Sequence, residues 1–109
     1  MVVRDKVGRK RYVVFCVDSE SSLSHEDFER AMVSMFREKG VLRSVRPRLI
    51  DFDGRTGIMR CAHTGKEEVI GLLNRIVDVK GTEVRIETVK TSGTLRKART
   101  VVKGLASGR

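Results

Sequence analysis

The chain has 109 residues, of which 39% are hydrophobic and 34% charged, and its formal net charge is +9 at neutral pH. This length predicts a single domain over residues 1–109 with one modest core, and the hydrophobic fraction is too high for a disordered chain. No apolar run approaches the roughly 20 residues that a membrane span needs, and no signal peptide is evident, so we expect a cytoplasmic protein without membrane contact.

The excess positive charge is concentrated at the two ends of the chain. Residues 1–11 contain five Lys or Arg and one acid, and residues 90–109 contain six Lys or Arg and no acid, whereas residues 12–89 are close to neutral. This distribution predicts a polyanionic partner. An anionic lipid surface is an alternative, although neither a lipidation signal nor a bulky aromatic anchor supports it. A basic surface that only keeps the protein in solution is the simplest alternative.

The first two predicted elements are a buried strand and an amphipathic helix. Residues 11–17, RYVVFCV, are apolar on both alternating faces, which predicts a central strand covered on both sides. Ser24 fits the N-cap of a helix over residues 24–39, and Gly40 fits its end. The apolar face of this helix consists of Phe28, Ala31, Met32, Met35 and Phe36.

Two strands are predicted next, over residues 47–53 and 56–62. Asp53 and Gly54 between them predict a hairpin turn. The third strand, TGIMRCA, has no aromatic residue on which a base could stack, so a base-reading RNA-recognition motif is disfavoured and recognition of an RNA backbone is favoured.

A second helix over residues 65–80 and a strand over residues 82–90 complete the predicted core. Thr64 and Glu67 form a capping-box pattern at the start of this helix, and Gly81 fits its end. The predicted core positions are Val13 or Val14, Phe15, Phe28, Met32, Phe36, Ile58, Leu72, Leu73, Ile76 and Ile86.

This β-α-β-β-α-β order predicts an α+β protein with a ferredoxin-like antiparallel sheet and both helices on one face. The other face of strand 11–17 then needs a cover, which residues 94–104 can supply as a short amphipathic helix. Leu95, Ala98, Val101, Val102 and Leu105 lie on its apolar side, and Arg96, Lys97, Arg99 and Lys103 lie on its basic side. A basic face of this kind suits a phosphate backbone, which we favour over a face that is merely solvated.

Candidate catalytic groups are few. His25 and His63 are not at metal-ligand spacing, and the two cysteines in apolar runs are expected to be buried thiols. Asp51 and Asp53 suit an outward strand position and a turn better than a magnesium site. No nucleophile, base and orienting group assemble, although acylphosphatase-like enzymes share this order of elements.

Several short motifs together resemble a known family. They are RDK at 4–6, RKRYVVF at 9–15, PRLIDFD at 47–53, TGIMRC at 56–61 and SGTLRKAR at 92–99. In their order and spacing they are similar to the Pop-five/Rpp-fourteen family, which includes ribonuclease P protein component 2 of archaea.

This resemblance implies an RNA-binding subunit of a ribonucleoprotein that removes the 5′ leader from precursor tRNA. The RNA would carry the catalysis with magnesium, and the protein would have no catalytic residues and bind no cofactor. The implied partners are ribonuclease P RNA, ribonuclease P protein component 3 and other protein subunits, with self-association in a heterotetramer. Another basic, ribosome-associated RNA-binding module and a small phosphate-handling enzyme are the alternatives. The RNA-contact candidates, by position, are Arg4, Lys6, Arg9, Lys10, Arg11, Arg60, Ser92, Gly93, Thr94, Arg96, Lys97 and Arg99.

Overall fold

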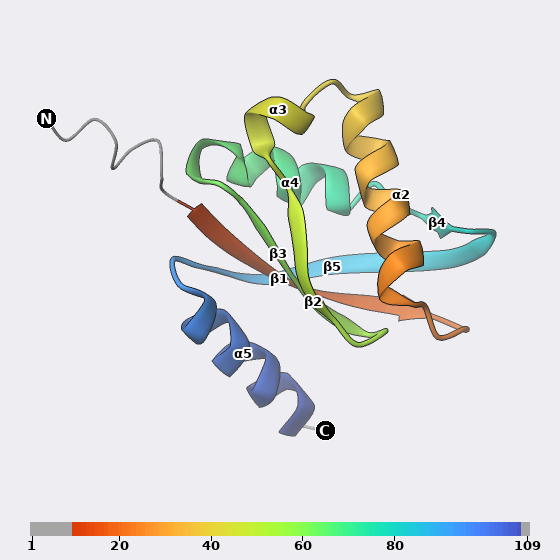
Figure 1. Ribbon diagram of the computed structural model, residues 1–109. Coiled ribbons are helices and arrows are strands. Elements are labelled where there is room, and N and C mark those ends of the chain that lie inside the picture. Colours follow the sequence, from red (N-terminus) through yellow and green to blue (C-terminus); the bar gives the residue numbers. More distant parts are fainter. Residues whose placement is uncertain (1–9, 108–109) are drawn as a thin grey trace, which may run out of the picture.

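The computed structural model describes residues 10–107 as a strongly twisted antiparallel sheet with helices on both faces (Figure 1). The strand order across the sheet is β2-β3-β1-β5-β4, so β1 is central. The strands are β1 (Lys10–Ser19), β2 (Arg48–Phe52), β3 (Thr56–Ala62), β4 (Asp78–Val79) and β5 (Thr82–Ser92).

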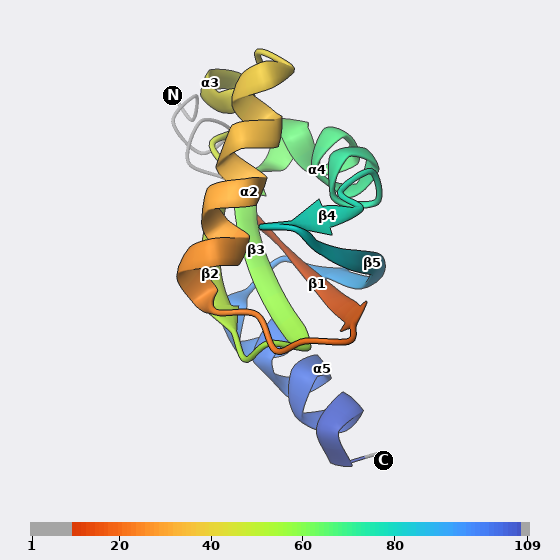
Figure 2. The same cartoon turned by 90° about the vertical axis from the view of Figure 1, so that its right-hand side faces the viewer.

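The helices are distributed unequally over the two faces. Three α-helices and one 3-10 turn lie on one face, and the C-terminal helix lies on the other (Figures 1 and 2). The first group comprises α2 (His25–Glu38), α3 (Leu42–Val45), η1 (His63–Gly65) and α4 (Lys66–Leu73), and the last helix is α5 (Leu95–Ser107). Within residues 10–107, none of these helices combines the length and apolar character that crossing a bilayer requires. The predicted ferredoxin-like α+β class is confirmed.

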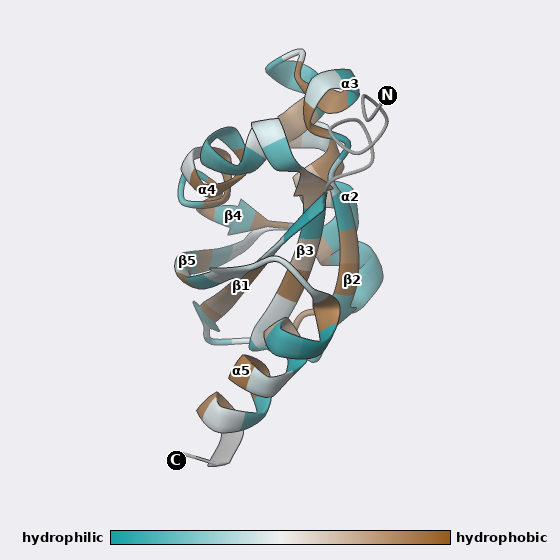
Figure 3. Ribbon diagram, turned by 90° about the vertical axis from the view of Figure 1, so that its left-hand side faces the viewer, coloured by the Kyte–Doolittle hydropathy of each residue, from teal (hydrophilic) through white to brown (hydrophobic). Residues whose placement is uncertain are grey.

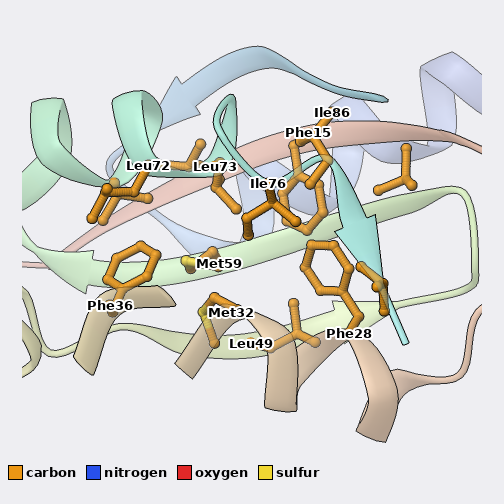
Figure 4. Close-up of a cluster of buried hydrophobic side chains, with 14 of the residues drawn as sticks. Phe15, Phe28, Met32, Phe36, Leu49, Met59, Leu72, Leu73, Ile76 and Ile86 are labelled. Atoms are coloured by element: carbon orange, nitrogen blue, oxygen red, sulfur yellow. The ribbon is translucent and has the colours of Figure 1, made fainter. Parts of the chain in front are cut away.

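The main core lies between the sheet and the first group of helices, and every predicted core position is buried (Figure 4). The rings of Phe15 and Phe28 stack with centroids 5.2 Å apart, and Phe28 and Phe52 stack at 4.7 Å. Gly57 lies opposite Phe15 in the β1–β3 register, and a Cβ placed on it would be 2.5 Å from the tip of the Phe15 ring. The phenylalanine stack therefore requires glycine at position 57.

A second, smaller core lies on the other face of β1, as predicted. Val14, Ile58 and Ala98 are fully buried there. The remaining apolar side chains that pack against this second core are Tyr12, Ile50, Leu95, Val101, Val102 and Leu105. Figure 3 shows hydrophobic and hydrophilic segments alternating along α5, as an amphipathic helix requires. The C-terminal helix thus covers the sheet face that β1 would otherwise expose.

The start and end of α2 follow the predicted local signals. The Ser24 hydroxyl accepts a hydrogen bond from the Asp27 amide at 3.1 Å, which caps the helix. Gly40 has a φ of +71°, a left-handed conformation that suits glycine after a helix. In the β2–β3 turn, the Asp53 carboxylate accepts hydrogen bonds from the amides of Arg55 and Thr56.

The predicted helix over residues 65–80 is too long, because α4 ends at Leu73. The later part of that range forms β4, which pairs with β5 across a two-residue turn. Lys80 and Gly81 in this turn have φ values of +53° and +84°, the conformation that a tight hairpin favours. Gly81 is therefore a turn residue, not a helix end. The capping box at Thr64 is also wrong, since Gly65 is the N-cap of α4 and no side chain caps it.

Candidate nucleic-acid interface

One end of the sheet brings together the starts of β1 and β2 and the ends of β3 and β5. In the antiparallel register, Arg48 lies opposite Arg60, Arg60 lies opposite Tyr12, and Tyr12 lies opposite Ser92. Directly opposite residues share a face of a sheet, so these four form a row across four strands. Tyr12 packs against the second core, which places the row on the face that carries α5.

Further basic residues lie at the same end of the molecule, some of them on α3 and α4 at the opposite face of the sheet. We call this region the basic end, and it comprises Lys10, Arg11, Arg43, Arg46, Arg48, Arg60, Lys66, Arg96 and Lys97. The stretches 41–48, 60–66 and 90–107, which supply most of it, contain no Asp or Glu.

The opposite end of the sheet is rich in acids, including Asp18, Glu20 and Glu83, which line one open groove. The starts of β1 and β2 are thus richer in bases than the opposite end of the sheet, where Arg85 lies among these acids.

The turn between β5 and α5 is organised by hydroxyl groups. The Ser92 hydroxyl donates to the Thr94 carbonyl at 3.1 Å and accepts from the Thr94 amide at 3.4 Å. The Thr94 hydroxyl accepts from the Lys97 amide at 3.2 Å, as an N-cap does. Ser92 is only 9% exposed, so its hydroxyl shapes the turn and is not an open contact.

Gly93 lies in this turn, close to the Arg11 side chain at the start of β1. A Cβ on Gly93 would lie 3.2 Å from a terminal guanidinium nitrogen of Arg11, which shows how closely that side chain approaches the turn. Arg11 and the exposed Arg96 and Lys97 therefore flank the N-terminus of α5, where unpaired amides and the helix dipole favour anions.

Arg99 has a different role from its neighbours. Its guanidinium donates two hydrogen bonds to the Asp51 carboxylate, at 2.9 and 3.3 Å. The hydrogen bond and the negative charge of Asp51 raise the pKa of Arg99 above its ordinary value. The β2–β3 register shifts between Leu49 and Asp51, and such a bulge can turn a side chain toward a new neighbour. Arg99 thus tethers α5 to β2 through its side chain.

The structure brings most of the sequence-predicted contacts together. Lys10, Arg11, Arg60, Arg96 and Lys97 all lie at the basic end with the turn at 92–94. The candidates at Arg4, Lys6 and Arg9 lie outside the described residues. Sequence reasoning missed Arg43, Arg46, Arg48 and Lys66, although the acid-free stretch VLRSVRPR at 41–48 was a signal for three of them.

The described side chains offer little for catalysis. Among residues 10–107, no three His, Cys, Asp or Glu side chains are placed to hold a metal ion together. Burial raises the pKa of the Cys61 thiol to about 11, so at neutral pH it is protonated and a poor nucleophile. Cys16 is only partly buried, in contrast to the expectation.

The fold and the charges define a small α+β protein with a ferredoxin-like sheet, helices on both faces and one end suited to a polyanion. The chain belongs to the Rpp14/Pop5 family, whose model matches residues 11–103.

Relatives and a solved structure are similar over most of the chain. Ribonuclease P protein component 2 of Archaeoglobus fulgidus is 32% identical over 84% of this chain and 86% of its own length. The component 2 protein of Pyrococcus furiosus is 33% identical over 87% of this chain and 81% of its own. A chain in the cryo-EM structure of yeast ribonuclease MRP shares the fold, with a TM-score of 0.66, 12% identity and coverage of 92% of this chain and 90% of that chain.

Proposed function

We propose that this protein is an RNA-binding subunit of ribonuclease P that supports the RNA-catalysed removal of the 5′ leader from precursor tRNA. The observation that carries this proposal is the match to the Rpp14/Pop5 family over nearly the whole chain. The gathering of basic side chains at one end of the sheet supports it, because phosphate contacts supply most of the affinity of such proteins for nucleic acid.

The arrangement favours contact with the RNA backbone over base stacking. In an RNA-recognition motif, the sheet face opposite the helices carries exposed aromatic residues. Here α5 covers that face, and Tyr12 packs against the second core beneath it. Phe15, Phe28 and Phe52 stack with one another inside the main core. Binding would therefore depend strongly on salt and weakly on RNA sequence.

The proposed partners are ribonuclease P RNA, protein component 3 and other ribonuclease P proteins, with self-association in a heterotetramer. The face of β1 opposite α2 and α4 is covered by α5 within the same chain, so this face is not the proposed partner surface. Among the described residues, the large hydrophobic side chains left exposed are Val77 and Val89. We expect magnesium at the RNA active site and no cofactor on the protein.

Reconstitution tests the proposal. Ribonuclease P RNA and the other protein subunits are assembled with and without this chain, and cleavage of a precursor tRNA is measured across a magnesium series. We expect omission of the chain to lower cleavage or to raise the magnesium requirement. Equal cleavage with and without it contradicts the proposal. Recovery of ribosomal RNA in place of ribonuclease P RNA, when the chain is purified from its native cell, favours the ribosome-associated alternative.

A further inference from the structure

Arg48 and Arg60 form a pair of like charges held side by side. They lie directly opposite each other in the β2–β3 register, on the face of the sheet that carries α5. Opposed residues on paired strands have Cβ atoms about 5 Å apart, and like charges at this distance destabilise a sheet. Arg48 is exposed and Arg60 is partly exposed, so both guanidinium groups can reach solvent.

No carboxylate of the described residues neutralises this pair. The ion pairs within residues 10–107 are His25–Glu29, Lys80–Asp27 and Arg99–Asp51. The nearest acid along β2 is Asp51, and its carboxylate is already bound by Arg99. The next members of the row beyond Arg60 are Tyr12 and Ser92, neither of which is a carboxylate.

The other end of the sheet shows a contrasting like-charge pair. Asp78 lies opposite Glu83 in the β4–β5 hairpin. There the Asp78 carboxylate accepts a hydrogen bond from the Gly81 amide at 3.2 Å, so it has a role in the turn. Arg48 and Arg60 have no such bond among the described residues.

We propose that Arg48 and Arg60 hold one phosphate of an RNA backbone between them. Two guanidinium groups can each donate paired hydrogen bonds to phosphate oxygens, and the bound charge would remove their mutual repulsion. The row continues through Tyr12 to Ser92, about 14 Å from Arg48 at about 4.8 Å per strand. Ser92 leads into the N-terminus of α5, which offers a second place for a phosphate. The RNA strand therefore crosses the basic end perpendicular to β1.

This inference rests on the proposed function, since it assumes an RNA partner. The variants are Arg48→Gln, Arg60→Gln and the double substitution. Arg85→Gln is the matched control, because Arg85 is an exposed base on the same face of the sheet but lies opposite Asp18 at the acidic end. Binding is measured to ribonuclease P RNA and to an unrelated single-stranded RNA across a salt series.

We expect each single substitution at Arg48 or Arg60 to weaken binding roughly tenfold, as loss of a charged hydrogen bond does. The double variant should lose less than the product of the two effects, because both side chains bind one phosphate. Arg85→Gln should bind as the unmodified chain does. Without RNA, Arg48→Gln and Arg60→Gln should raise the melting temperature at low salt, and the gain should disappear at high salt.

The outcomes separate this inference from the proposed function. If the unmodified chain binds ribonuclease P RNA tightly and Arg48→Gln and Arg60→Gln bind it equally well, the phosphate site is overturned. The proposed function then still stands. Loss of affinity for both RNAs in the two variants, together with reconstituted cleavage that is equal with and without this chain, contradicts the ribonuclease P assignment and supports the phosphate site. Fully additive losses in the double variant overturn the sharing of one phosphate.

Discussion

Replacing Arg96 and Lys97 together with Ala should weaken RNA binding and leave the fold intact. Both side chains are exposed in the first turn of α5, and the N-cap bond there uses the Lys97 backbone amide, which the substitution retains. Alanine is also the best helix former. The double variant therefore changes the charge at the N-terminal end of α5 without changing the helix.

The size of the effect follows from counterion release. Each lost phosphate contact should lower the slope of log affinity against log salt by roughly 0.7–0.9, so two contacts lower it by about 1.6. When salt rises from 50 to 200 mM, both proteins lose affinity, and the factor by which the unmodified chain loses it should be about nine times the factor for the variant. Fluorescence anisotropy with ribonuclease P RNA over a salt series measures this difference, and circular dichroism checks the fold.

Arg99→Ala is the control on the same helix. Its guanidinium is bound to Asp51, so this substitution should leave the salt slope unchanged and lower the melting temperature slightly. A folded Arg96/Lys97 variant with the slope of the unmodified chain would refute the contact role of α5. A reduced slope of log affinity against log salt in Arg99→Ala would show that Arg99 leaves Asp51 and contacts the RNA when the complex forms.

Three further outcomes test the core. Phe36→Ala should lower the free energy of unfolding by roughly 3–5 kcal/mol, because Phe36 is fully buried and truncation leaves a cavity. Denaturant titration measures this change, and a loss below about 1 kcal/mol would contradict the buried position of Phe36. Gly57→Ala should cost roughly 1–3 kcal/mol, since its methyl group would overlap the ring of Phe15, and wild-type stability in the same assay would contradict that contact. The raised pKa of Cys61, about 11 against an ordinary 9.0, keeps the thiol protonated in the folded chain while the unfolded chain ionises. Its contribution to stability is therefore complete below about pH 9 and lost as the pH rises to about 11, and a Cys61→Ala variant should not show that loss.

The sequence predicted the elements whose signals are local. The apolar residues of strand 11–17 alternate to both sides, and the five apolar residues of the C-terminal helix recur at helical spacing, so the sheet and both cores could be derived. Ser24 and Gly40 carry their own conformational preferences, and they placed the ends of α2 correctly.

Ile76 continues the apolar spacing of α4 and is buried, so the helix was predicted too long, whereas residues 78–79 pair with β5 across the two-residue turn at Lys80 and Gly81. The other errors came from partners distant in the sequence. The bond between Arg99 and Asp51 joins residues 48 positions apart. Arg48 and Arg60 become neighbours only through the β2–β3 register. The sequence therefore predicted the basic residues of the two termini as contacts, but it did not show which residues from the middle of the chain join them.

The position of α5 at the end of the fold has a consequence for biosynthesis. Before this helix is made, Val14 and Ile58 have no cover, because the second core is completed by Ala98. A partly synthesised or truncated chain would therefore present an apolar sheet face to other chains and to chaperones. The helix that closes this face also carries Arg96 and Lys97. Completion of α5 thus buries the apolar sheet face and adds the last two members of the basic end in the same step.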